Sequence, residues 1–101
     1  MKELLETVDL MNSKNYKERF VAEYWQTKIR YEKLKDFCNK IEAGEMMNRI
    51  GINLNIPQHD CPYDLLREQQ YLMGKTLHLL DLRAIIEHID LDQEIRSNDD
   101  C

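Results

Sequence analysis

The chain has 101 residues, a formal net charge of −5, 33% charged residues and 43% hydrophobic residues. This composition is typical of a globular protein and excludes a largely disordered one, and the length fits a single domain, 1–101. The acidic balance argues against general nucleic-acid binding, and no apolar run approaches the roughly 18 residues of a membrane span.

Three cysteines bear on the cellular compartment. They are Cys38, Cys61 and Cys101, an odd number that contains no CxxC pair. The sequence also shows no secretory signal peptide. We therefore predict reduced thiols in a cytoplasmic protein.

The first predicted element is a short N-terminal helix or arm over residues 1–12. Leu4, Leu5, Val8 and Met11 recur there at helical spacing. Capping residues follow and interrupt this helix.

A long helix is predicted over residues 15–43. Asn15 and Glu18 have the spacing of a capping box, and Gly44 is the residue type most often found just past a helix end. The apolar positions on its inward side are separated by alternating steps of four and three, which indicates a heptad seam. These positions are Phe20, Tyr24, Thr27, Tyr31, Leu34, Cys38 and Ile41.

A linker over residues 44–62 and a second long helix over residues 62–89 are predicted next. Ile52, Leu54 and Ile56 alternate with polar residues, which suggests a short extended piece in the linker. Pro62 suits the first helical position. Residues 90–101 form an acidic tail.

Both long helices carry more apolar surface than one partner helix can bury. The second helix has two apolar lines, one of Leu66, Met73, Leu77, Leu80 and Ala84, the other of Leu65, Leu72, Leu79, Leu82, Ile86 and Ile89. The first helix has Val21, Ala22, Trp25 and Ile29 opposite its seam. We predict an all-α fold, an antiparallel two-helix hairpin with a short N-terminal helix. Its second apolar face should be buried against the N-terminal arm, against another copy in a homo-oligomer, or against both.

Two stretches resemble a family of small bacteriophage proteins that is named after a gene of a crAss-like phage. They are YKERFVAEYWQTKIRYEKL, residues 16–34, and LLREQQYLMG with the leucines and LDLRA that follow it in the second helix. The second helix is also similar to the helical-hairpin domain of phage proteins that sequester the cyclic nucleotide signals of CBASS and Thoeris immunity. This likeness implies a cyclic nucleotide ligand and does not assign a role to any single residue.

A candidate ligand strip lies on the second helix. Tyr63, Arg67, Tyr71, Gly74 and His78 fall within about 80° of its circumference. The tyrosines offer stacking faces, the guanidinium suits phosphate, and glycine permits close approach. The alternative is helix–helix packing, in which Gly74 admits a neighbouring helix.

Trp25 is a second candidate for ligand binding, because Arg19, Tyr24 and Lys28 lie near it in sequence. An exposed indole beside basic groups can stack on a base. The alternative is an anchor in an oligomer interface, where aromatic residues concentrate.

Catalytic chemistry has weak support. His59, Asp60 and Cys61 are adjacent in sequence, but Asp60-Cys61-Pro62 also suits the start of a helix. We predict no catalytic residue, no metal site and no cofactor. The protein should bind rather than catalyse.

The predicted function is that of a phage accessory protein that sequesters a cyclic nucleotide immune signal in the cytoplasm of the infected bacterium. Two alternatives stay open. In the first, the acidic segment 81–101 makes the protein an inhibitor that binds a host defence nuclease. In the second, the hairpin is a structural or assembly factor without a small ligand.

Overall fold

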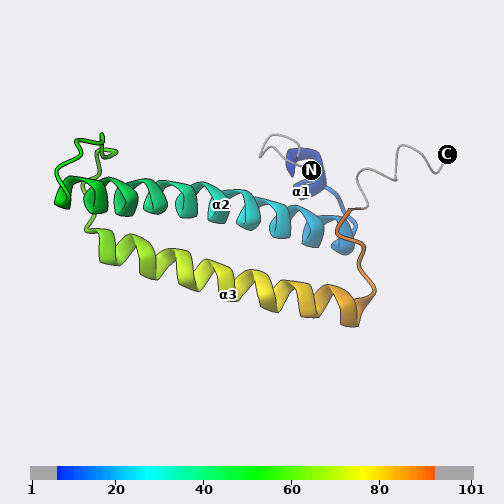
Figure 1. The fold of residues 1–101 in the computed structure, drawn as a ribbon. Helices are drawn as coiled ribbons and strands as arrows, with labels where there is room; N and C mark the ends of the chain where they lie inside the picture. Colours follow the sequence, from blue (N-terminus) through cyan, green and yellow to red (C-terminus); the bar gives the residue numbers. More distant parts are fainter. Residues whose placement is uncertain (1–6, 93–101) are drawn as a thin grey trace.

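The computed structural model describes residues 7–92, and within this range every regular element is a helix (Figure 1). α1 spans Val8–Met11, α2 spans Tyr16–Arg49 and α3 spans Tyr63–Glu87. α2 and α3 run antiparallel and pack together, and α1 lies against the first part of α2. The predicted all-helical hairpin with a short N-terminal helix is therefore confirmed.

Some expectations concern other parts of the chain. Leu4, Leu5, Cys101 and most of the acidic tail lie outside the described residues. No helix in residues 7–92 is both long enough and apolar enough to cross a membrane.

α2 begins at the predicted cap. The side-chain oxygen of Asn15 accepts a hydrogen bond from the backbone N–H of Lys17 at 2.8 Å. The carboxylate of Glu18 accepts from the hydroxyl of Ser13, and that hydroxyl oxygen accepts from the backbone N–H of Asn15 at 3.0 Å. Ser13 and Asn15 thus share the capping of N–H groups that the first turn of a helix leaves without partners.

α2 ends later than the predicted residue 43. The helix passes through Gly44 and continues to Arg49. A Cβ atom at Gly44 would lie 2.6 Å from Cγ1 of Ile56, so this glycine lets the linker pack against the helix. Gly51 occupies the turn after the helix instead, with a φ of 87° that glycine adopts without steric cost. The linker is therefore shorter than the predicted 44–62.

α3 is bounded by backbone hydrogen bonds at both ends. The carbonyl oxygen of Pro62 accepts from the N–H groups of Leu65 and Leu66, which places Pro62 at the cap and not at the first helical position. At the other end His88 has a φ of 58°, and the N–H of Ile89 donates to the carbonyl of Ala84 at 2.8 Å. α3 thus ends before the predicted Ile89, and the chain turns back toward α2.

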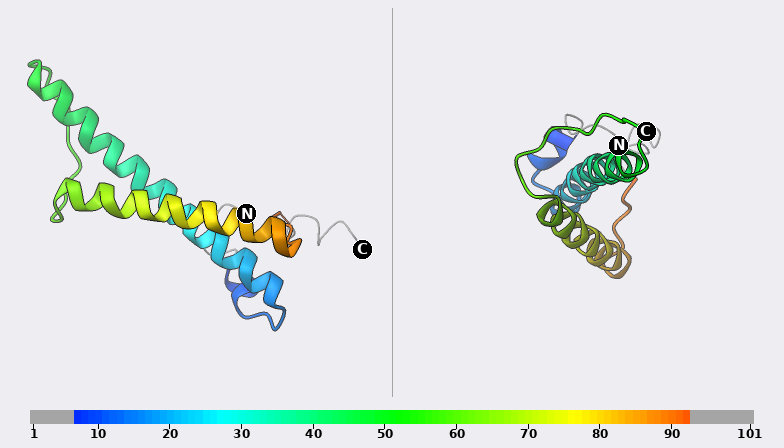
Figure 2. Two further views of the ribbon diagram at one scale, coloured as in Figure 1. Left: turned by 90° about the horizontal axis from the view of Figure 1, so that it is seen from below. Right: turned by 60° about the vertical axis from the view of Figure 1, so that its left-hand side comes forward.

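The predicted seams meet between the two long helices. Every member of the α2 seam is buried or half-buried, as is every member of the Leu66–Ala84 line of α3. Figure 2 shows that α2 and α3 cross at an angle, so they pack closely over only part of their length. The core cluster comprises Phe20, Val21, Tyr24, Leu77, Leu80, Ala84 and Ile89, near the start of α2 and the end of α3.

The second face of α2 is covered by the two ends of the described chain. Val21 and Ala22 are fully buried, and Leu10 and Leu91 pack against the core cluster. The N-terminal arm therefore covers α2 as predicted, but through Leu10, whereas the predicted contact residues Val8 and Met11 are exposed. The second apolar line of α3 is open along the helix, since Leu65, Leu72 and Leu79 are between 52% and 59% exposed. Its last predicted member, Ile89, instead lies beyond the helix and is buried in the core cluster. Burial of the open line by another copy stays a prediction.

Candidate functional site

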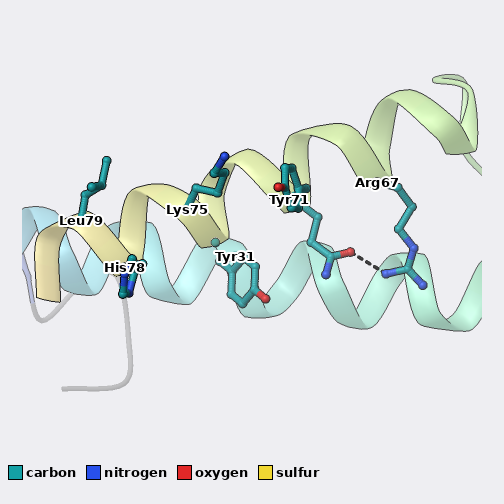
Figure 3. A pocket seen from close by; sticks show the side chains of 8 residues that line it. Tyr31, Arg67, Tyr71, Lys75, His78 and Leu79 are labelled. Atoms are coloured by element: carbon teal, nitrogen blue, oxygen red, sulfur yellow. Dashed lines mark hydrogen bonds between the residues drawn. The ribbon is translucent and has the colours of Figure 1, made fainter. Parts of the chain in front are cut away.

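One side of α3 contains a hollow of about 650 Å³, which we call the Tyr71 hollow (Figure 3). It is lined by Tyr31, Arg67, Gln70, Tyr71, Gly74, Lys75, His78 and Leu79. Four of the five residues of the predicted strip are among them. The fifth, Tyr63, contacts the hollow through Arg67.

Gly74 lies where α2 approaches α3. A Cβ atom at this position would lie 3.2 Å from Cε1 of Tyr31, which is closer than ordinary van der Waals contact. Glycine therefore admits the Tyr31 ring, as the packing alternative predicted. The same contact brings Tyr31, a member of the α2 seam, into the wall of the hollow.

Arg67 joins the two long helices at one end of the hollow. Its Nη2 donates to Oε1 of Glu42 at 2.6 Å and to Oδ1 of Asn39 at 2.9 Å, both on α2. Its Nε donates to the hydroxyl of Tyr63 at 2.6 Å, and its Nη1 donates to the side chain of Gln70. We call these five residues the Arg67 cluster.

The Arg67 cluster sets the ionisation of its members. The hydrogen bond from Arg67, with a second from Tyr63, holds the pKa of Glu42 below its usual range. Desolvation raises the pKa of the Tyr63 hydroxyl, and the hydrogen bond to Tyr63 raises that of Arg67. Since one N–H on Nε, one on Nη1 and two on Nη2 are engaged, four of the five guanidinium donors already have protein partners.

Lysines supply the remaining positive charge around the hollow. The ammonium of Lys75 lies 5.3 Å from the centroid of the Tyr71 ring, and that of Lys35 lies 5.9 Å from the centroid of the Tyr31 ring. Neither forms an ion pair with a carboxylate in residues 7–92. Each tyrosine of the hollow thus has a cation beside its face, available to an anionic ligand.

Trp25 is placed apart from this hollow. Its Nε1 donates to the carbonyl oxygen of Leu91 at 2.6 Å, its ring packs edge-to-face on Tyr24, and Lys28 lies 5.5 Å from its ring centroid. The indole is half-buried under the segment that follows α3. Trp25 therefore anchors the end of the described chain, and it does not join the residues of the predicted strip.

His59 and Cys61 are placed in the linker. Nδ1 of His59 lies 2.6 Å from the backbone oxygen of Cys61, and its ring packs edge-to-face on Phe37. The imidazole thus faces the backbone of Cys61. His59 and Cys61 lie just before the first residue of α3, Tyr63.

Sequence reasoning missed four residues that line the hollow: Tyr31, Gln70, Lys75 and Leu79. Gln70, Lys75 and Leu79 are neighbours of the strip at the helical spacings of three, four or eight residues, so a wider strip would have included them. Tyr31 belongs to another helix. Its place in the wall depends on how α2 and α3 cross, which the sequence pattern does not specify.

Comparison with known proteins identifies a family. The Sequestin family model matches residues 14–86, which include all of α2 and nearly all of α3. The chain belongs to the Sequestin family. No curated protein and no solved structure matches it. The matched segment of this Sequestin chain contains the whole Tyr71 hollow and the Arg67 cluster.

Proposed function

We propose that this protein is a bacteriophage accessory protein that counters host defence by sequestering a cyclic nucleotide signal in the Tyr71 hollow. The observation that carries the proposal is the combination of two aromatic rings, Tyr31 and Tyr71, with the ammonium of Lys75 in the lining of one hollow. Membership of the Sequestin family supports it, because the family's name refers to sequestration. The resemblance to phage nucleotide-binding hairpins points to the same ligand class.

The size and the lining of the hollow suit a nucleotide. Small-molecule sites typically measure about 300–1,000 Å³, and the Tyr71 hollow measures about 650 Å³. Stacking of a base on an aromatic side chain contributes roughly 1–3 kcal/mol. Tyr31 comes from α2 and Tyr71 from α3, so bases can stack on rings from both helices.

Phosphate recognition falls mainly to Lys75. The guanidinium of Arg67 is held by Glu42 and by three neutral partners, which leaves one N–H for a ligand. Lys75 has no such competitor among the described residues and stands at the rim of the hollow. Arg67 therefore orients one wall, and the Lys75 ammonium is the point charge that a phosphate approaches.

Sequestration requires binding and no bond cleavage. A protein of this kind lowers the free concentration of a signal in proportion to its own abundance and affinity. We propose that it acts without catalysis and without a cofactor, in the cytoplasm of the infected host.

Thermal unfolding with a panel of cyclic dinucleotides, cyclic trinucleotides and cyclic ADP-ribose isomers tests the proposal. A ligand present at 100 times its dissociation constant, and bound by the folded state alone, adds about 2.7 kcal/mol. For a domain of about 100 residues this raises the melting temperature by roughly ten degrees or more. We expect one class of cyclic nucleotide to give this shift.

Two variants localise the binding. Lys75→Gln should weaken the affinity for the active nucleotide at least tenfold, because it removes the free cation and keeps a similar side-chain length. Lys33→Gln is the matched control, an exposed lysine of α2 that does not line the hollow. If no member of the panel binds the wild-type protein, or if both variants bind equally well, the proposed site is wrong.

A second candidate is an acidic inhibitor that binds a host defence nuclease. It rests on the segment 81–101, which carries seven acidic side chains and two basic ones. Truncation after Asp92 should abolish this inhibition, retain the contact between Trp25 and Leu91, and leave nucleotide binding unchanged. Capture of a nuclease by the full chain, together with no response to any nucleotide, would favour this candidate.

A further inference from the structure

The side of α3 turned away from α2 carries a second heptad seam. Its positions follow steps of three and four along the helix and fall within about 100° of its circumference. They are Leu65, Glu68, Leu72, Lys75, Leu79, Leu82 and Ile86, which we call the outer face. Its five apolar members are all exposed, and Figure 3 shows Leu79 and Lys75 projecting away from α2.

Two charged residues interrupt this seam at equivalent positions of the heptad. Glu68 and Lys75 lie on either side of Leu72, one turn away from it in each direction. A parallel copy would place Glu68 against Glu68 and Lys75 against Lys75. An antiparallel copy that crosses near Leu72 places Glu68 within about one turn of the partner's Lys75, and Leu65 near the partner's Leu79 or Leu82.

We propose that a second copy of this chain covers the outer face, with the two α3 helices antiparallel and crossing near Leu72. Leucines at the apolar positions supply the burial, as in other helical seams. The antiparallel orientation is favoured because the parallel one would bring like charges together at the interface. The partner's Glu68 lies about one turn from Lys75 and does not face it directly, so the ammonium keeps its place in the lining of the hollow.

The orientation has a consequence for the Tyr71 hollow. The two-fold axis that relates two antiparallel helices is perpendicular to both of them. Rotation about this axis therefore places the same flank of each copy on the same side of the dimer. Tyr71 and His78 occupy the same flank of the outer face. The hollows of the two copies therefore open on the same side of the dimer, with Lys75 and Leu79 at the border that both copies share.

The binding site is thus completed by the partner copy. In one chain Lys75 and Leu79 line the hollow and are exposed, and the partner's α3 provides a further wall beside them. Tyr71 and His78 from both copies face one composite site. The composite site rests on the proposed nucleotide function, whereas the antiparallel dimer does not.

Sedimentation equilibrium at micromolar concentrations tests the interface. The wild-type protein should have the mass of two chains. Leu72→Gln should raise the dimer dissociation constant at least tenfold, whereas Ile85→Gln should not change it. Ile85 is the matched control because it is 72% exposed but lies about 140° away from Leu72 around α3. A monomeric wild-type protein, or equal effects of the two variants, would overturn the proposal.

Charge reversal tests the orientation. Glu68→Lys alone and Lys75→Glu alone should each weaken the dimer, and the double reversal should restore it to within about threefold of wild type. In a parallel dimer like charges face each other in the wild type and in every variant, so the single reversals would leave the dimer dissociation constant nearly unchanged. Circular dichroism of each variant at low concentration establishes that the monomer keeps its helices.

Nucleotide titration of Leu72→Gln separates the two proposals. We expect at least tenfold weaker affinity for the nucleotide that the wild-type protein binds. Unchanged affinity in a monomeric Leu72→Gln would overturn the composite site and leave the nucleotide proposal standing. An absence of nucleotide binding by a wild-type dimer would overturn the nucleotide function and leave the antiparallel dimer standing.

Discussion

Both long helices carry more apolar surface than their contact with each other can bury. The rest of the described chain covers this surplus on α2 but not on α3. On α2, the face opposite the seam is covered by α1 and by residues 89–91, so Val21 and Ala22 are fully buried. On α3, the face opposite the seam is covered by nothing in residues 7–92, and its leucines are about half exposed. The described ends of the chain both lie on α2, and neither is placed over the outer face of α3.

This difference indicates which surface serves the fold and which is left for another molecule. A monomer with an apolar face of this length on one helix exposes a patch of the kind found at interaction sites. The core cluster lies near the start of α2 and the end of α3, on the other side of α3. Substitutions on the two sides of α3 should therefore act on two different equilibria, unfolding and association.

The largest expected effect comes from two adjacent leucines of α3. Leu80 is 3% exposed and Leu79 is 59% exposed. Leu80→Ala should lower the free energy of unfolding by about 2–5 kcal/mol, because it leaves a cavity in the core. Leu79→Ala should change it by no more than about 0.5 kcal/mol at concentrations where the protein is monomeric. Urea denaturation of both variants at low protein concentration makes the measurement.

The same pair distinguishes the two faces at higher concentration. As the concentration rises, the wild-type protein should gain stability through association, and Leu79→Ala should gain less. Equal losses for the two variants in the monomer would show that the outer face is buried within one chain. The outer face would then not be available to a second copy, and the dimer proposal would be wrong.

The sequence was enough to predict the helices, but not the way in which they cross. The heptad steps, the cap at Asn15 and the two apolar lines of α3 predicted both long helices and both surplus faces. The predicted end of the first long helix at Gly44 was wrong, because a glycine that follows a helix and a glycine that lies under a packed linker cannot be distinguished in sequence. Only the structure shows Ile56 against Gly44.

The sequence predicted several of the residues that α3 contributes to the candidate site, but not those that α2 contributes. The strip on α3 followed from the periodicity of a single helix, and four of its residues line the hollow. Tyr31 and Glu42 come from α2, and their positions depend on the crossing of the two helices. Trp25 was assigned to a ligand because nearby charges in sequence suggested exposure, whereas the turn after α3 brings Leu91 over its indole.

A second, smaller effect is expected from Trp25 on the covered side. Trp25→Phe keeps an aromatic ring but removes the N–H that donates to the carbonyl of Leu91 at 2.6 Å. The free energy of unfolding should fall by about 1 kcal/mol, the usual net worth of such a bond. Nucleotide affinity should stay at the wild-type value. A tenfold weaker affinity would instead show that Trp25 contributes to ligand binding.

Gly74 tests how firmly the two helices are packed where Tyr31 meets α3. Alanine is favoured over glycine in a helix interior by about 1 kcal/mol, but its Cβ would lie 3.2 Å from the Tyr31 ring. Tyr31 is half-buried beside an open hollow, so its ring has room to shift by a few tenths of an ångström. Gly74→Ala should therefore raise the free energy of unfolding by up to about 1 kcal/mol. A loss instead would show that the ring is held as rigidly as the core cluster.

The smallest expected effect concerns the end of the hairpin that the core cluster does not reach, where the Arg67 cluster holds α2 to α3. Since the pKa of Glu42 is lowered in the folded protein, its ionised form contributes stability above its ordinary value of 4.5, and that contribution is lost as the pH falls through the lowered value. Glu42→Gln should remove this part of the pH dependence of the melting temperature between about pH 3 and 6. Glu45→Gln, at an exposed glutamate of the same helix, should retain it. Identical acid profiles for wild type and Glu42→Gln would show that the ion pair between Arg67 and Glu42 does not stabilise this end of the hairpin, and that apolar packing at residues such as Cys38 and Ile41 is sufficient there.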